Sequence, residues 1–522
     1  MSMGTLPAEI LSAASEHDTA KCIFSSAVRP VNATVGALVS DAERVAGALQ
    51  GRGIGRGDVV AVQLPNWYEG AVAQAAVMLC GATLVPIVDT YGPREIGFIL
   101  RQSGASAVFV PGTWRRRNYP ALIASIGDLP ALRTVIVVDD DGPAPADTLR
   151  FSDLTARFAR PYAAPTGIAP GDRATLIFTS GTTAAPKGVQ HSHASVLAEM
   201  TSPVMLRSRD PEARYLALFP GGHVAGLLGL LRMLLHGGLT VHLDRWGSAR
   251  AARMVDEHEL TRTSAAPIHL TGLLDERERG TATLNSLREV LTGAAGVPPA
   301  LIRRADDAGI LAYRTYGSSE HPTISSGLPE DSLAKRATTD GRVIEGNEIR
   351  LVDPAGQDVS DGTPGEIVSR GGELFSGYSD QTLDVEAFLP GRWYRTGDVG
   401  RIDQDGYLTI TGRIKDIIIR GGEKISAKEI EDILAQHPKI VEAAVIGAPD
   451  ERYGERVCAV VVTRGGAELD LEEVGTLFAS VGAARQKTPE EIVVVDELPR
   501  TASGKVQKYL LRTQVGGVRN EQ

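Results

Sequence analysis

Short apolar runs alternate with longer amphipathic stretches through roughly the first 340 residues of the chain. The runs have the length and the β-branched content of buried strands, and they lie at 58–64, 82–88, 106–110, 134–138 and 174–178. Between them, stretches such as 69–82 and 93–104 repeat apolar residues at helical spacing. This alternation predicts a layered α/β protein.

After about residue 340 the pattern changes to short strands separated by turns, at 349–356, 365–371, 393–398 and 406–413. Beyond Arg413 it predicts a helix at 426–438 and strands at 442–449, 456–462 and 491–498. The chain has 522 residues, which is more than one core normally holds. We therefore expect an α/β fold with a large multilayer N-terminal domain, residues 1–412, made of two α/β subdomains and a β-rich subdomain. A small α+β C-terminal domain, residues 413–522, follows it.

The charge balance argues against nucleic acid as a partner, because the chain has 54 basic and 64 acidic residues and a formal net charge of −10. The three cysteines, Cys22, Cys80 and Cys458, lie far apart and form no CxxC pair. They predict neither a disulfide framework nor a zinc cluster, and they fit a reducing compartment.

The first 21 residues acquire acidic side chains too early for a secretory signal, so we expect a cytoplasmic protein. Two apolar stretches, 71–88 and 224–235, contain polar residues or proline or are short, and we expect buried elements rather than membrane spans. Peripheral membrane contact and a homodimer stay open.

A hydroxyl-rich loop follows the apolar run at 174–178. It consists of Thr179, Ser180, Gly181, Thr182 and Thr183, and Lys187 comes shortly after it. Glycine lets the backbone turn tightly, hydroxyl and N–H donors can share phosphate oxygens, and lysine adds a positive charge. The loop is not a Walker loop, because Lys187 precedes the last glycine. Taken alone, the segment could equally be a Ser/Thr-rich surface turn.

Several motifs in order closely resemble the adenylate-forming superfamily, which contains acyl-CoA synthetases, luciferases and peptide-synthetase adenylation domains. They read TSGTTAAPKG at 179–188, TYGSSE at 315–320, YRTGD at 394–398, GRIKDIIIRGGEKI at 412–425 and PRTASGK at 499–505. The chain looks most like an AMP-forming fatty-acid-type acyl-CoA synthetase. Such an enzyme joins a carboxylic acid to AMP, using ATP with Mg²⁺ and releasing pyrophosphate, and then passes the acyl group to the thiol of coenzyme A.

The resemblance implies a nucleotide site. Thr179 to Thr183 and Lys187 would hold the β- and γ-phosphates, and Glu320 would contact Mg²⁺. Tyr316 would stack on adenine and Asp398 would accept the ribose hydroxyls, with Arg413 as a second contact. The remaining members of the implied site are Gly293, Ala294, Ala295, Gly317, Ser318 and Ser319. Each of these residues, taken singly, also has an ordinary reading as a turn, a packed side chain or a surface ion pair.

The same resemblance makes Lys505 the catalytic lysine, with Glu320 and Lys187 assisting it. It also makes the C-terminal domain mobile, since that domain would rotate about a hinge at Lys415 between the two half-reactions. Gly421 and Gly422 would then line a tunnel for the thin arm of coenzyme A. Taken alone, Lys415 could simply be a charged residue on a turn.

The residues that line the acyl pocket are the hardest part of the site to infer from the sequence. By resemblance it is lined by His223, Ala225, Gly226, Leu227, Ala266 and Ile324. No cationic cluster obviously awaits a second carboxylate, so we expect an apolar monocarboxylic acid of fatty, alicyclic or aryl type.

Three positions depart from the usual pattern of the superfamily. Ala184 replaces a glycine, Ser319 a threonine and Ala427 a proline. Two alternative functions remain: a ligase that loads the acyl group onto a carrier-protein phosphopantetheine, and a non-catalytic binding protein on the same scaffold.

Overall fold

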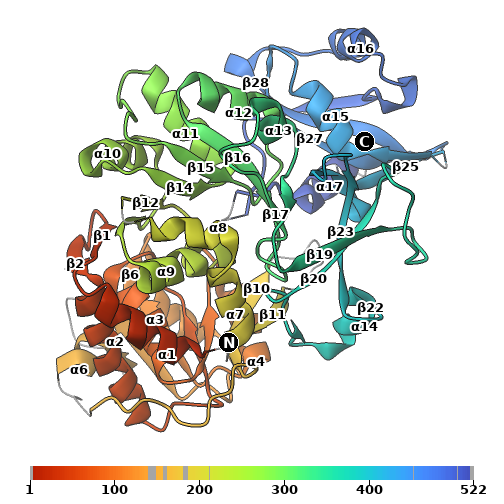
Figure 1. The fold of residues 1–522 in the computed structure, drawn as a ribbon. Coiled ribbons are helices and arrows are strands. Elements are labelled where there is room, and N and C mark those ends of the chain that lie inside the picture. The colour runs from red at the N-terminus through yellow and green to blue at the C-terminus, as the bar shows by residue number, and fades with distance from the viewer. Residues whose placement is uncertain are drawn as a thin grey trace.

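The computed structural model describes residues 4–138, 148–156, 161–179, 186–210, 212–421, 423–450, 452–501 and 504–517. Within these ranges the predicted elements are confirmed, and the fold is a mixed α/β fold with a large N-terminal part and a smaller C-terminal part (Figure 1). The predicted boundary at 412/413 falls at the last residues of strand β24 (Leu408–Arg413) and remains a prediction.

The first large sheet has eight strands and a mostly parallel core. Its order is β21 (Gly377–Tyr378), β11 (Lys187–Ser192), β10 (Arg173–Thr179), β4 (Thr83–Pro86), β3 (Val59–Val62), β5 (Ala107–Pro111), β8 (Thr134–Val138) and β9 (Thr148–Arg150). Helix α3 (Tyr68–Leu79) is buried from Gly70 to Leu79, and it joins a core that also includes α2 (Val35–Gln50). Its continuous apolar character therefore reflects burial inside the protein.

The second large sheet has nine strands. Six neighbours in it, β16, β15, β14, β12, β13 and β1, run parallel to one another. Its order is β18 (Arg342–Val343), β17 (Ser325–Ser326), β16 (Leu311–Tyr316), β15 (Glu289–Thr292), β14 (Arg262–Ala265), β12 (Arg214–Ala217), β13 (Leu239–Leu243), β1 (Lys21–Ser25) and β2 (Val31–Thr34). The carboxyl ends of parallel strands meet at one edge, which is where such sheets bind ligands.

A third sheet of five strands forms the predicted β-rich region. It contains β19 (Asn347–Val352), β20 (Gly365–Gly371), β22 (Phe388–Leu389), β23 (Trp393–Ile402) and β24. The C-terminal part has its own sheet of β25 (Ile417–Arg420), β26 (Glu423–Ser426), β27 (Ile440–Asp450), β28 (Gly454–Thr463) and β29 (Glu491–Val494), covered by helices. Those helices are α15 (Ala427–Leu434), α16 (Leu471–Ser480) and α17 (Lys508–Gly517), and two separate apolar clusters fill this part.

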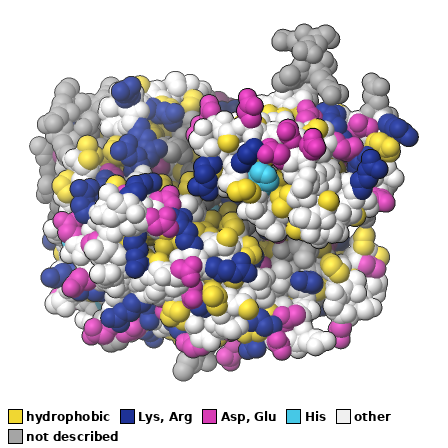
Figure 2. Space-filling model, turned by 90° about the horizontal axis from the view of Figure 1, so that it is seen from above, with side chains coloured by type: hydrophobic (Ala, Val, Ile, Leu, Met, Phe, Trp, Pro, Cys, Tyr) yellow, Lys and Arg dark blue, Asp and Glu magenta, His cyan; other side chains and the backbone are white. Residues whose placement is uncertain are grey.

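The C-terminal elements are blue in Figure 1, and Lys428 on α15 lies close to Gly296, just before the green helix α12 (Pro299–Asp307). On the face that Figure 2 shows, basic and acidic side chains are interspersed rather than gathered by sign. Within the described ranges, no helix has the length and apolarity needed to cross a membrane.

Candidate active site

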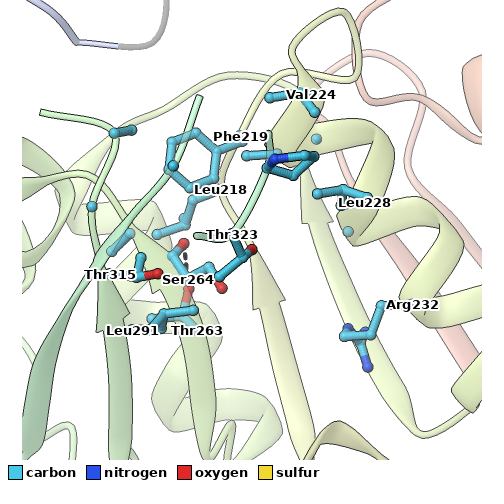
Figure 3. Close-up of a pocket in the computed structure, with 18 of the residues that line it drawn as sticks. Leu218, Phe219, Val224, Leu228, Arg232, Thr263, Ser264, Leu291, Thr315 and Thr323 are labelled. Carbon is cyan, nitrogen blue, oxygen red and sulfur yellow. Dashed lines mark hydrogen bonds between the residues drawn. The ribbon is translucent and has the colours of Figure 1, made fainter. Parts of the chain in front are cut away.

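The segments that follow β12, β14, β15 and β16 meet at the carboxyl edge of the nine-stranded sheet and enclose a cavity of about 200 Å³. Helix α9 (Val224–His236) forms another wall, and Lys505 reaches the cavity from the C-terminal part. Figure 3 shows side chains from these strands and from α9 directed into one space. Residues from the two parts of the chain therefore share one site.

The turns after β15 and β16 form a wall made of backbone and small side chains. Gly293, Ala294, Gly317, Ser318 and Ser319 all line the cavity. A Cβ on Gly317 would lie 1.9 Å from the carbonyl oxygen of Pro322, so only glycine fits there. Ala294 has a φ of 65°, which is strained for a residue with a Cβ. Ala295 lies just outside the lining.

Asp398 on β23 is a buried carboxylate held from two sides. The Tyr316 hydroxyl donates to Oδ2 at 2.8 Å, and the Arg413 Nε lies 2.7 Å from Oδ1. The register of β23 and β24 places Arg413 directly opposite Asp398. Burial and the neighbouring Asp398 raise the pKa of Tyr316 well above its usual range, so the phenol stays a donor. The three predicted nucleotide contacts thus form one cluster.

Glu320 and Lys187 both contact Tyr378, at a second place in the site. The Tyr378 hydroxyl donates to Glu320 Oε1 at 2.8 Å, and the Lys187 Nζ lies 4.9 Å from the centre of the same ring. Thr179 pairs with Lys187 across β10 and β11, so both ends of the predicted phosphate loop are in place. Ser180, Gly181, Thr182, Thr183 and Ala184 lie outside the described residues.

Glu320 is the described residue that best suits a magnesium ion, and it would bind the ion together with a phosphate-bearing substrate. Among the described residues no three His, Cys, Asp or Glu side chains gather into a metal site. Glu320 is 9% exposed and has a second carboxylate oxygen, which suits a hard cation. Magnesium is commonly bound by one or two carboxylates plus phosphate oxygens, so the donor set fits.

Sequence reasoning missed His191, which fixes the turn before Glu320. Its Nε2 lies 2.7 Å from the carbonyl oxygen of Ser319, and its Nδ1 lies 3.1 Å from Ser195 Oγ. Burial lowers the pKa of His191, so the ring stays neutral and Nε2–H can donate to that carbonyl. The only signal in the sequence was its place on the strand after the phosphate loop.

Lys505 sits at the end of a small loop that is closed on itself. Its backbone N–H donates to Thr501 Oγ1 at 3.1 Å, and the Thr501 N–H donates to the Lys505 carbonyl at 2.8 Å. A Cβ on Gly504 would lie 3.3 Å from Ile268 on α11 (Pro267–Glu278), so the loop contacts the N-terminal part. Burial and Arg413 lower the pKa of Lys505, and Asp398 and Glu320 oppose that shift. All three predicted charged groups therefore act on this ammonium.

His223 occupies the N-cap of α9 at the cavity wall. Its Nδ1 accepts from the Ala225 N–H at 3.2 Å, and its ring stacks on Phe219. Burial and the charge of Lys505 lower the pKa of His223 to about 3, so the ring is neutral. A Cβ on Gly226 would lie 1.9 Å from the Pro220 carbonyl oxygen. Glycine is required there by backbone packing as well as by space in the cavity.

Three members of the predicted acyl wall do not face the cavity, and each is replaced by its neighbour. Leu228 lines the cavity while Leu227 points into the apolar core of the N-terminal part. Ala265 and Thr323 likewise line the cavity, whereas their neighbours Ala266 and Ile324 are buried and lie outside its lining. Leu227 and Leu228 are consecutive on α9 and point in different directions, so a shift of one position decides which of the two lines the cavity.

The predicted hinge and tunnel residues lie apart from the cavity in this arrangement. Lys415 is exposed in the short helix η3 (Ile414–Asp416), and its carbonyl accepts from Arg512 Nη2 at 3.3 Å. Gly421 has a φ of 58° in the β25–β26 hairpin, where its N–H donates to the Tyr453 carbonyl at 2.8 Å. Gly422 lies outside the described residues. The hinge and the tunnel remain predictions.

Sequence reasoning also missed the charged residues that line part of the cavity. Arg207, Arg232, Arg262, Glu199 and Glu289 all contribute to its lining. In the sequence, Arg232 lies among leucines and methionine, which suggested only an interrupted apolar helix.

The chain is similar to known proteins along most of its length. A family model described as AMP-binding enzyme matches residues 12–379, and the model of the AMP-binding enzyme C-terminal domain matches residues 429–505. The medium-chain fatty-acid–CoA ligase of Escherichia coli is 36% identical over 92% of this chain and 86% of its own length. A Rhodococcus jostii CoA ligase for a methyl-dioxo-octahydroindenyl propanoic acid is 34% identical over 90% of this chain and 91% of its own.

Among solved structures, the anthranilate CoA ligase AuaEII in complex with anthranoyl-AMP superposes with a TM-score of 0.88. It is 25% identical, and the match covers 99% of this chain and 98% of that one.

Proposed function

The chain belongs to the family of AMP-binding enzymes, and from this premise we propose that it is an AMP-forming acyl-CoA ligase. Its substrates are ATP, coenzyme A and a monocarboxylic acid with an apolar body of fatty, alicyclic or aryl type. The observation that carries the proposal is the position of Lys505 in the wall of the cavity, within electrostatic reach of Asp398 and Glu320.

In the first half-reaction a carboxylate oxygen bonds to the α-phosphorus of ATP, and pyrophosphate leaves with the electrons of the broken P–O bond. Both reactants are anionic, so a cation must lie between them. The Lys505 ammonium supplies that charge at the cavity wall. Asp398 accepts the ribose hydroxyls, and Tyr316 flanks the adenine beside Gly293 and Ala294.

The phosphates lie toward Lys187 and the loop that follows Thr179. Glu320 is the protein ligand of Mg²⁺, which supplies neutralising charge for the phosphate oxygens when it is bound. Tyr378 holds the Glu320 carboxylate in place through its hydroxyl. His223 stays neutral and orients the acyl group at the entrance to the apolar part of the cavity.

In the second half-reaction the thiol of coenzyme A attacks the acyl carbonyl carbon, and AMP leaves. Lys505 takes up part of the cavity wall, so we infer that it must withdraw before the thiol can approach. We assign the hinge to Lys415, and the approach of the coenzyme A arm to Gly421 and Gly422. We also assign the protein to the cytoplasm.

The test is acid-dependent release of pyrophosphate from ATP across a panel of fatty, alicyclic and aryl acids. Lys505→Ala should abolish the release, whereas Lys487→Ala should not. Lys487 is the matched control, because it lies in the same part of the chain and is paired at the surface with Glu429 at 2.5 Å. Adding either coenzyme A or a phosphopantetheine-loaded carrier protein then identifies the acceptor. Absence of acid-dependent release with every acid would refute the proposal.

A further inference from the structure

Arg232 lies deep in the acyl cavity on the face of α9 that points into it. Ala225, Leu228, Gly229 and Arg232 line the cavity at helical spacing, and the Arg232 side chain is among the buried charged groups at 5% exposure. In Figure 3 it lies at the opposite end of the helix from Val224 and Phe219. It follows His223 by nine residues, which corresponds to about 13 Å along the helix axis.

The contacts of Arg232 are neutral. Its Nη2 donates to Thr240 Oγ1, its Nη1 donates to the Gly237 carbonyl at 3.5 Å, and the guanidinium lies 3.7 Å from the centre of the Tyr215 ring. In the part of the chain that the structure describes, no carboxylate lies within 4.0 Å of it. A guanidinium has five N–H donors, so several remain for a ligand.

The other two arginines in the cavity lining differ from Arg232, because both are paired with carboxylates. Arg207 contacts Glu330 at 3.0 Å, and Arg262 contacts Asp210 at 3.2 Å and Glu289 at 3.3 Å. Their charges are therefore compensated by the protein. Arg232 alone among the three brings an uncompensated charge to the inner end of the cavity.

A buried charge without a counter-charge is costly, and it is usually tolerated where it has a function. Burial lowers the pKa of Arg232 only to about 10, so the side chain is charged at neutral pH. A plain alkyl chain packed against it would leave its remaining donors without partners, which is unfavourable. An oxygen atom on the ligand would satisfy them.

We propose that Arg232 selects acids that carry a hydrogen-bond-accepting oxygen at the end remote from the reacting carboxylate. This inference rests on the proposed function and narrows its substrate class to an acid with an apolar body and a keto oxygen at its far end. A second carboxylate at that end would satisfy Arg232 in the same way, and it would correct the proposed class from monocarboxylic to dicarboxylic acids. The separation of about 13 Å fits a chain of about ten carbon–carbon bonds in zigzag form.

The experiment measures kcat/KM for pyrophosphate release with three acids of equal length: decanoic acid, its derivative with a ketone next to the terminal methyl, and decanedioic acid. The wild-type protein should prefer at least one oxygen-bearing acid over decanoic acid by about 10- to 100-fold, the range expected for a buried hydrogen bond to a charged group. Which of the two it prefers identifies the acceptor group.

Two variants and one control separate selection from a structural role. Arg232→Met removes the charge at similar length, and it should abolish the preference while raising kcat/KM for decanoic acid. Arg232→Lys keeps the charge and should retain part of the preference. Leu228→Met changes the shape of the same helix face without changing charge, and it should keep the preference.

Equal kcat/KM of the wild-type protein for decanoic acid and both derivatives would overturn the inference and leave the proposed function intact. The inference also fails if Arg232→Met lowers Tm and reduces activity equally with all three acids, since that result indicates a purely structural residue. Failure of the proposed function looks different, because no acid would then release pyrophosphate.

Discussion

Replacing Glu373 by glutamine tests how a buried carboxyl pair beside the acyl cavity is protonated. Glu199 on α7 (His193–Met200) and Glu373 after β20 are 1% and 3% exposed, and they lie within hydrogen-bond reach of each other. Thr323 Oγ1 donates to Glu199 Oε1 at 2.7 Å, but Oε2 of each glutamate has no partner among the described residues. One proton held between the two groups would satisfy both oxygens.

Burial and the neighbouring Glu199 raise the pKa of Glu373 far above its usual value. The folded protein then keeps a proton that the unfolded chain releases above about pH 4.5. Stability falls as pH rises through that window, because the folded state binds more protons than the unfolded state. For one proton the loss is about 1.4 kcal/mol per pH unit, or roughly 3 kcal/mol between pH 5 and pH 7.

Glutamine mimics the protonated carboxyl group and does not titrate. Glu373→Gln should therefore flatten the dependence of stability on pH and be at least as stable as the wild-type protein at pH 8. The assay is denaturant unfolding at pH 5, 6, 7 and 8, with the exposed Glu345→Gln as a control that keeps the wild-type slope. The reasoning is refuted if Glu373→Gln keeps that slope and is less stable at pH 8, because Glu373 would then be ionised in the folded protein.

Three further predictions concern the site itself. Gly226→Ala should destabilise the protein by about 1–3 kcal/mol in thermal unfolding, because the added Cβ would clash with the Pro220 carbonyl. The control Gly229→Ala should not destabilise it, because the space around Gly229 is open. Equal effects of the two substitutions would contradict the packing argument. Asp398→Asn should raise KM for ATP by about tenfold or more in pyrophosphate-release kinetics by removing a buried acceptor, and an unchanged KM would remove Asp398 from the nucleotide site. Glu320→Gln should raise the Mg²⁺ concentration needed for half-maximal activity, whereas the surface control Glu348→Gln should leave that concentration unchanged. If the two variants needed the same Mg²⁺ concentration, Glu320 would be excluded as the ligand.

The sequence predicted the parts of this structure that depend on local pattern. Buried strands such as β3 and β5 are continuous β-branched runs, and the motif residues Tyr316, Asp398 and Lys505 meet in space because each lies at the end of a predicted element or in a tight loop. It is harder to predict which side chains of a helix or strand face the cavity and which face the core. Leu227 and Leu228 are the same residue type side by side, and only packing against the core decides which one faces the cavity.

Long-range electrostatics could not be predicted from the sequence at all. Arg232 was an isolated charge in an apolar helix. That no carboxylate of the described ranges lies near it depends on how α9, β12 and β13 pack together. Glu199 and Glu373 are far apart in the chain, and nothing local to either residue indicates that they share a proton.

The central claim is that an organic acid is joined to AMP in this cavity with the Lys505 ammonium between the two anions. The most direct test measures the two half-reactions separately in Lys505→Ala: acid-dependent exchange of pyrophosphate into ATP, and thioester formation from acyl-AMP supplied ready-made. We expect exchange to fall by about 100-fold or more while thioester formation from acyl-AMP persists. Exchange at the wild-type rate in Lys505→Ala would contradict the central claim.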